Sequence, residues 1–238
     1  MLSPIVVKIM RMLPESLLVK FTKMTVNRYL KKYGSFDVQG LENIEKVKGA
    51  KIFISNHLSN ADGLVIDMLL REKYDPTFIA GAKLSDDPVT NLGTKLVKNI
   101  QIKPNTADKD AITNMVKLIK SGQNMVMFPE GTRSRGKSMI EAKKGILLIS
   151  RLTKAPIVPI ALWGTEKLLP INEGGTMADE TWKHADVHVR IGEPITLPVR
   201  SADEDKKEFE KKSMDYVMKS IANLLPEEYR GVYTNSKE

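Results

Sequence analysis

The chain has 238 residues, of which 42% are hydrophobic and 28% charged, the composition of an ordinary globular protein with room for one sizeable core. It contains no cysteine, which excludes disulfides and thiolate metal ligands. The formal net charge is +8, and no stretch approaches the roughly 20 apolar residues that a membrane-spanning helix needs.

The first 33 residues carry most of this charge. They hold seven lysines and arginines and one glutamate, so +6 of the net +8 lies in this segment. Because these charges interrupt the apolar residues and no small-residue cleavage site follows, we do not expect a secretory signal. Two amphipathic helical patterns, separated at Leu13-Pro14, fill the segment instead. The apolar side of the second pattern comprises Leu17, Phe21, Met24 and Leu30. Such a helix either lies in the interface of an anionic membrane or packs on the protein's own core.

Strands and helices alternate through the rest of the chain. In chain order we expect a short strand and a polar turn within 35–50, a strand at 51–55, a helix near 62–72, a strand at 77–82, a helical stretch at 86–98, a strand at 100–102, a helix capped at Thr106 or Asp108 and ending near Ile119, a strand at 124–128, a helix near 139–153, strands at 156–162 and 186–192, and a charged helix at about 203–224. This alternation predicts an α/β fold with a mostly parallel, mixed central sheet flanked by helices. The simplest division is an N-terminal amphipathic helical pair at 1–34 and one domain at 35–238.

His57 lies where the strand at 51–55 passes into a helix, and Asp62 lies five residues later. If His57 is on the turn and Asp62 in the first helical turn, the carboxylate can accept the imidazole N–H and fix its tautomer. The other ring nitrogen can then remove a proton from a hydroxyl group. The alternative is that Asp62 caps the helix and His57 fills a turn.

A second polar loop, FPEGTRSRG at 128–136, follows the strand at 124–128. Glycine lets backbone approach a ligand closely, and the guanidinium groups of Arg133 and Arg135 suit phosphate; the alternative is a solvated surface loop. Because parallel strands end at one edge of a sheet, we expect this loop to lie near His57. A base, an anion clamp and a basic helical segment together indicate activation of a hydroxyl on a phosphate-bearing lipid.

The blocks NHLSNAD at 56–62 and FPEGTR at 128–133 resemble the signature blocks of the glycerolipid acyltransferase family, and bacterial 1-acyl-sn-glycerol-3-phosphate acyltransferases most of all. Between and after them come FIAGAK at 78–83, IQIKPN at 100–105 and APIVPIALWG at 155–164, in the order that the family has. The resemblance covers about residues 35–200 and implies a glycerol-3-phosphate acyltransferase-like fold.

By this resemblance His57 is the general base and Asp62 orients it. An acyl chain would pass from acyl-ACP or acyl-CoA to the sn-2 hydroxyl of lysophosphatidic acid, giving phosphatidic acid. The residues that match the acceptor-binding block are Glu130, Gly131, Thr132 and Arg133. Arg133 is the expected phosphate ligand, and Lys83 is a second candidate cation. The resemblance implies no cofactor and no metal, and it favours the anionic surface on the cytoplasmic face of the cell membrane as a partner.

One departure from the family concerns the acceptor. Relatives often have an arginine after the strand that here reads IQI, whereas this chain has Lys103. Lysine offers a point charge rather than a fork of donors. The acceptor is therefore left open between lysophosphatidic acid and another substrate, such as glycerol 3-phosphate or a different lysophospholipid.

Four other interpretations are less well supported. A hydrolase would need a nucleophile, and the chain has no GxSxG elbow. A nucleic-acid binder would need stacking aromatics, which make up 6% of the chain, so we expect no nucleic-acid partner. A catalytically inactive lipid-binding protein is disfavoured because both blocks keep their ionisable residues. A metal site at His184 and His188 is disfavoured because the chain has no cysteine and offers no clear third ligand.

Overall fold

The computed structural model describes residues 14–81, 95–103, 106, 108–171 and 180–234. Its elements, in chain order, are α2 (Glu15–Tyr33), β1 (Gly34–Gln39), the 3-10 helix η1 (Leu41–Lys46), β2 (Ile52–Ser55), α3 (Ala61–Tyr74), β3 (Thr77–Gly81), β4 (Asn99–Ile102), α5 (Lys109–Lys120), β5 (Met125–Met127), α6 (Gly145–Thr153), β6 (Ile157–Trp163), α7 (Thr165–Leu168), β7 (Ala185–Ile191), α8 (Lys206–Ala222) and the 3-10 helices η3 (Glu227–Tyr229) and η4 (Gly231–Tyr233).

The described strands form one seven-stranded sheet in the order β1-β7-β6-β2-β5-β3-β4. Within this described sheet, β6 and β7 pair antiparallel and the other neighbours pair parallel. The predicted mostly parallel, mixed sheet is therefore confirmed. The central position of β2, between β5 and β6, places the turn that follows it at the middle of the sheet's carboxyl edge.

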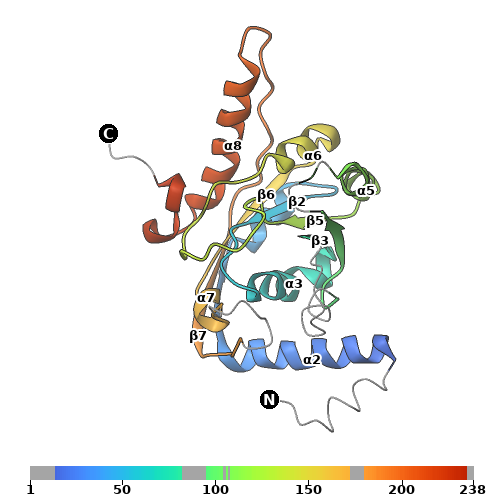
Figure 1. The fold of residues 1–238 in the computed structure, drawn as a ribbon, viewed down its shortest axis with the longest axis vertical. Coiled ribbons are helices and arrows are strands. Elements are labelled where there is room, and N and C mark those ends of the chain that lie inside the picture. The colour runs from blue at the N-terminus through green and yellow to red at the C-terminus, as the bar shows by residue number, and fades with distance from the viewer. Residues whose placement is uncertain (1–13, 82–94, 104–105, 107, 172–179, 235–238) are drawn as a thin grey trace.

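Helices cover both faces of the sheet (Figure 1), with α2 and α3 on one side and α5, α6 and α8 on the other. Side chains of β2 alternate between the two resulting cores, since successive residues of a strand point to opposite faces. Ile52 and Ile54 pack with α5, α6 and α8, whereas Phe53 packs with α2 and α3. All four residues of β2 are buried, which explains why this strand reads as a continuous apolar run.

The end of α2 contributes to the core. Leu30 is fully buried, whereas Leu17, Phe21 and Met24 are 42%, 53% and 61% exposed. The prediction that Leu30 shares their side of the helix is wrong, because nine residues separate it from Phe21 and rotate it by about 180° around the axis. Among the described helices, none combines the length and the apolar character that a membrane crossing requires.

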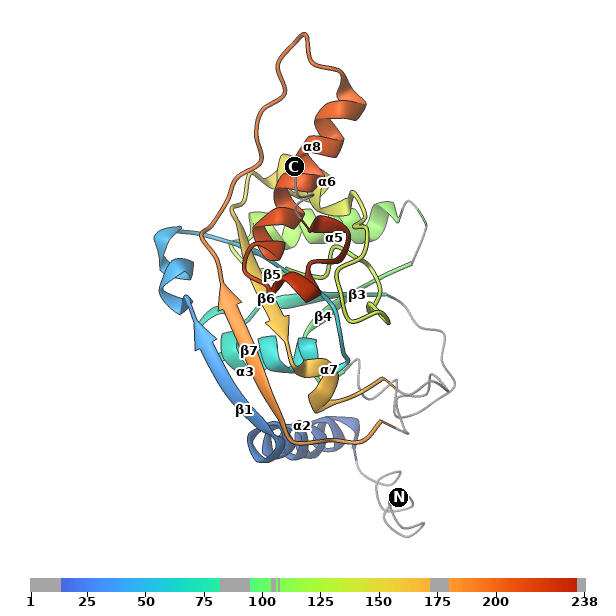
Figure 2. The same cartoon turned by 90° about the vertical axis from the view of Figure 1, so that its left-hand side faces the viewer.

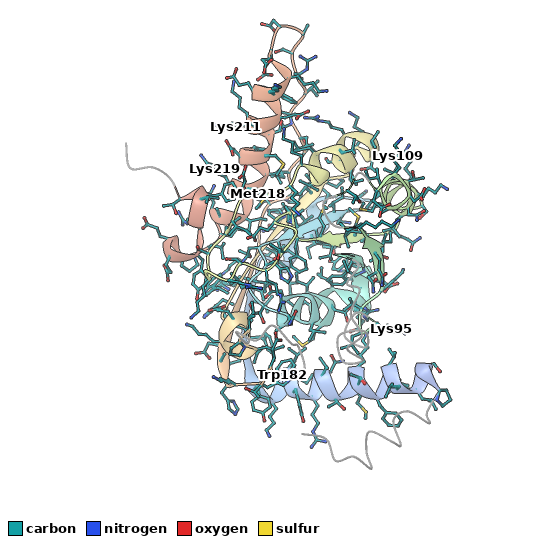
Figure 3. The ribbon with its side chains drawn as sticks, viewed as in Figure 1. Lys95, Lys109, Trp182, Lys211, Met218 and Lys219 are labelled. Atoms are coloured by element: carbon teal, nitrogen blue, oxygen red, sulfur yellow. The ribbon has the colours of Figure 1, made fainter. Side chains whose placement is uncertain are left out.

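Figure 2 shows β1 and β7 side by side along one edge of the molecule, with α2 beneath them. The last long helix, α8, packs one side on the sheet. Met218 is fully buried there, while Lys211 and Lys219 lie exposed on the same helix (Figure 3). This is the amphipathic pattern expected of a helix that covers one face of a sheet.

Three predicted helices differ from the observed ones. Residues 139–144 are not helical, because their N–H groups bond elsewhere: Met139 to the Tyr229 carbonyl and Lys143 to the Pro129 carbonyl. The helix predicted at 203–224 begins at Lys206, where the Asp205 side chain caps it. Of the stretch predicted as helical at 86–98, residues 86–94 lie outside the described residues and 95–98 form a turn. By contrast, the cap expected at Asp108 is present and accepts the Ala111 N–H.

Candidate active site

The loop after β2 and the first turn of α3 bring His57 and Asp62 together. The distance from His57 Nδ1 to Asp62 Oδ2 is 2.8 Å. A carboxylate at Nδ1 holds the imidazole proton on that nitrogen and leaves Nε2 as the basic one. The contact therefore has the geometry that a hydroxyl-activating base requires.

Asp62 is fully buried and is held by backbone as well as by the imidazole. Its Oδ2 accepts the N–H of Leu58 at 2.6 Å and that of Ser59 at 2.9 Å. Ser59 also uses its hydroxyl, which accepts the Ala61 N–H and donates to the Leu169 carbonyl. These bonds wrap the loop tightly around the carboxylate, so the orientation of Asp62 is set before any substrate arrives.

The ring of His57 stacks on that of Phe128, with 4.1 Å between ring centroids and 18° between planes. The His57 side chain is 20% exposed, so part of it reaches the surface. Asn56, just before it, donates to the Leu162 carbonyl and accepts the Leu162 N–H. The imidazole is therefore fixed by a carboxylate, an aromatic face and a loop tied to β6.

The carboxylate of Glu130 is buried next to the backbone of His57. Oε1 accepts the His57 N–H and Oε2 accepts the Ile140 N–H, each at 2.9 Å, and the residue is 1% exposed. Burial raises the pKa of Glu130 from 4.5 to about 7, against the lowering effect of the two N–H donors, and the Asp62 charge adds to the rise. Its observed contacts are thus with the backbone that supports the base.

The rest of the second loop, from Gly131 to Ser134, also lies next to His57. Gly131 has a φ of +71°, in the left-handed region that favours glycine, and its N–H bonds the Phe128 carbonyl. Thr132 is exposed. The Ser134 N–H donates to the His57 carbonyl at 2.7 Å, which joins the two signature loops. The expected closeness of this loop to His57 is therefore confirmed.

Arg133 forms an ion pair that the sequence did not indicate. Its Nη1 lies 3.3 Å from Oε1 of Glu180, and both Glu180 oxygens accept from Asn60 Nδ2 at 2.8 Å. Glu180 lies 47 residues further along the chain and in no recognisable motif, so periodicity and spacing carried no signal for it.

Of the two lysines predicted to bind the substrate, Lys83 and Lys103, the structure describes Lys103. Lys83 is outside the described residues. Lys103 is exposed just after β4, where its N–H bonds Asp108, and β4 is three strands away from β2. Three strand spacings amount to about 14 Å, so Lys103 is not in the immediate surroundings of His57.

In the part of the chain that the structure describes, no group of three or more His, Asp or Glu side chains is placed to hold a metal ion. His188 stacks on Trp163 and bonds Asp37, and it lies on the face of β7 opposite the buried Val187 and Val189, as expected. His184 contacts Tyr33 instead. Four residues of extended chain span about 13 Å, too far for His184 and His188 to share one ion.

Comparisons with known proteins agree with this fold and these loops. The family model for acyltransferases matches residues 35–163. BAT2, a chloroplastic 1-acyl-sn-glycerol-3-phosphate acyltransferase of Brassica napus, is 32% identical over 161 residues, which cover 67% of this chain and 44% of that protein. A 1-acyl-sn-glycerol-3-phosphate acyltransferase of Borreliella burgdorferi is 29% identical over 133 residues, covering 54% of this chain and 51% of that protein. The chain thus spans about half the length of these relatives or less.

Among solved structures, the 1-acyl-sn-glycerophosphate (LPA) acyltransferase PlsC from Thermotoga maritima matches with a TM-score of 0.57 and 24% identity, covering 90% of this chain and 86% of that one. This match confirms the predicted acyltransferase fold. The family model spans more than half of the chain, from β1 to the end of β6, and includes both signature loops. The chain therefore belongs to the acyltransferase family.

Proposed function

We propose that this protein transfers an acyl chain from acyl-ACP or acyl-CoA to the sn-2 hydroxyl of 1-acyl-glycerol 3-phosphate, giving phosphatidic acid for phospholipid synthesis. The observation that carries the proposal is the contact of 2.8 Å between His57 and Asp62 beside the loop that holds Arg133. The names of the relatives support the choice of acceptor.

The reaction needs no nucleophile from the protein. His57 Nε2 takes the proton of the acceptor hydroxyl as the hydroxyl oxygen attacks the thioester carbonyl carbon. Asp62 stabilises the imidazolium that forms. The C–S bond then breaks, and the departing thiolate takes the proton from the imidazolium, so His57 returns to its starting state. Arg133 binds the phosphate group of the acceptor, while Gly131 and Thr132 give the loop its shape and its exposed surface.

We propose further that residues 1–34 dock the enzyme on the cytoplasmic face of an anionic membrane, and that 35–238 form the catalytic domain. The exposed stripe of Leu17, Phe21 and Met24 supports docking. Lys20, Arg28 and Lys31 on the same helix add positive charge; together with Met24, Asn27 and Lys23, which pairs with Asp67, they line a groove of about 550 Å³. Apolar side chains among acyl chains and cations on headgroups are the usual arrangement of an interfacial helix.

The test is acyl transfer from labelled acyl-CoA and labelled acyl-ACP to lysophosphatidic acid, glycerol 3-phosphate or water. We expect phosphatidic acid from lysophosphatidic acid, with His57→Ala lowering kcat by roughly 10²- to 10⁴-fold and His184→Ala leaving it unchanged. The donor that is used identifies the carrier. Acylation of glycerol 3-phosphate alone would replace the acceptor, release of free fatty acid alone would indicate a hydrolase, and turnover that does not depend on His57 would refute the mechanism.

A further inference from the structure

Glu180 connects the two signature loops of the site. One of its neighbours, Asn60, belongs to the loop between His57 and Asp62, and the other, Arg133, belongs to the loop after β5. The Glu180 side chain is 4% exposed and that of Arg133 is 19% exposed. A carboxylate buried to this degree is stable only when it is paired and hydrogen-bonded, so these contacts account for its position.

The hydrogen bonds of Asn60 also connect Glu180 to the loop that carries His57. Asn60 is the N-cap residue of α3, and asparagine at this position usually accepts a backbone N–H with its side chain. Here its backbone is already helical and the Ser59 hydroxyl accepts the Ala61 N–H, so the Asn60 side chain makes no capping bond; its amide nitrogen donates to both oxygens of Glu180 at 2.8 Å. The Asn60 amide thus bonds a residue 120 positions away, while Ser59 supplies the local bond at the start of α3.

The segment that carries Glu180 is itself anchored. Trp182 packs edge-on against Tyr29 of α2, with 6.0 Å between ring centroids, and Figure 3 shows it beside that helix. The Lys183 N–H bonds the Leu168 carbonyl of α7. Glu180 therefore extends from a fixed stretch of backbone, as a residue that orients another side chain must.

We propose that Glu180 is a positioning residue that orients the Arg133 guanidinium toward the acceptor phosphate and ties it to the loop carrying the base. Arginine has five N–H donors in a rigid fork, and Nη1 faces Glu180. Holding that nitrogen removes the rotamer freedom of the long side chain and leaves other donors of the fork for phosphate oxygens. The inference rests on the proposed function, because it assigns Arg133 to the acceptor.

The test compares Glu180→Gln, Arg133→Ala and the double variant in the full chain. We expect Glu180→Gln to raise the KM for lysophosphatidic acid roughly tenfold, with kcat and the KM for the acyl donor within about twofold of wild type. If Glu180 acts through Arg133, adding Glu180→Gln to Arg133→Ala should raise the acceptor KM no further. Glu193→Gln is the matched control, because Glu193 is an exposed partner of Lys46 outside the site.

Glu180→Asp keeps the charge on a shorter side chain and should raise the acceptor KM less than Glu180→Gln does. This variant keeps the test valid if Glu180→Gln fails to fold. An acceptor KM that is unchanged or lowered, equal effects on both substrates, or additive effects in the double variant would overturn the inference. A wild-type protein that makes no phosphatidic acid would instead refute the proposed function, so the two failures are distinguishable.

Discussion

At the scale of single residues, the described contacts restrain His57 at its ring and at both polar groups of its backbone. Asp62 holds Nδ1, Phe128 covers one ring face, Glu130 accepts the backbone N–H and Ser134 donates to the carbonyl. A base that is fixed in this way loses little freedom when the acceptor binds, which is the condition for efficient proton transfer. Glu130 contributes to this fixation by accepting the His57 N–H, but burying its charged carboxylate costs free energy.

That cost predicts a pH dependence of stability. Because burial raises the folded-state pKa of Glu130 from 4.5 to about 7, the folded protein keeps a proton that the unfolded chain releases in this range. The free energy of unfolding should therefore fall as pH rises from 4.5 to 7, by about 3 kcal/mol for this group. Urea unfolding across the range should show this fall in the wild-type protein, and Glu130→Gln, which cannot ionise, should largely remove it.

The matched control is Glu141→Gln, which changes an exposed glutamate close to the same segment. It should keep the wild-type slope of stability against pH. The comparison is of slopes, because Glu130→Gln also weakens one of two backbone contacts and lowers stability at every pH. An unchanged slope in Glu130→Gln would show that another group titrates.

At the scale of elements, the C-terminal turns act on the active site through residues 139–142. Met139 bonds the Tyr229 carbonyl with its N–H and accepts the Val232 N–H, and the Ala142 N–H donates to the Tyr233 hydroxyl. Ile140, between them, donates to Glu130. The segment that was predicted as helix is thus held open by η3 and η4, and it carries one of the two N–H groups on Glu130.

Gly231 is the position in these turns where an added side chain would disturb the contacts with Met139 most. Its φ is +54°, and a Cβ there would lie 1.9 Å from the Met139 carbonyl oxygen. We expect Gly231→Ala to push residues 139–140 away, to destabilise the fold by more than about 2 kcal/mol and to lower kcat roughly tenfold through Glu130 and His57. Denaturant unfolding and acyl-transfer kinetics would measure the two effects.

Gly122→Ala separates this clash from backbone strain, since Gly122 has a φ of +89° and nothing within 4 Å of its Cβ position. It should cost about 1 kcal/mol and leave kcat unchanged. Equal losses of stability and activity in both variants would mean that the contact with Met139 does not matter.

At the scale of the whole molecule, α2 has one side packed on the core and another exposed. Its final turns bury Leu30 in the core, while its exposed side carries Leu17, Phe21 and Met24. Deleting residues 1–33 would therefore remove core packing together with the proposed membrane dock. The two roles are separable by substitution, because side chains on opposite sides of one helix share no contacts.

We expect the triple substitution of Leu17, Phe21 and Met24 by glutamine to abolish sedimentation with vesicles that contain anionic phospholipid, since the apolar area available for insertion is lost. The free energy of unfolding should change by less than about 0.5 kcal/mol, because these side chains are already exposed. Val199→Gln and Val232→Gln, at exposed positions outside α2, should keep vesicle binding. Retained sedimentation of the triple variant would refute docking through this stripe.

Much of this protein could be predicted from local patterns in the sequence. Short apolar runs and amphipathic stretches located the strands and most helices, and the alternation of strands with helices predicted the mixed sheet. The spacing of His57 and Asp62 across a strand-to-helix turn allowed their contact, because both lie within one short stretch of chain, and the resemblance to the acyltransferase family favoured it over a helix cap. The position of the loop at 128–136 followed from the common edge at which parallel strands end.

Other features depend on groups that meet only when distant segments pack together. The irregular backbone at 139–144 is set by the C-terminal turns, which lie about 90 residues away in the chain. Glu180 reaches Arg133 and Asn60 across separations of 47 and 120 residues. Local periodicity reports which way a side chain faces but not which distant partner it meets. That choice is made by tertiary packing, because a buried charge or N–H group must find its partner wherever the fold brings one within reach.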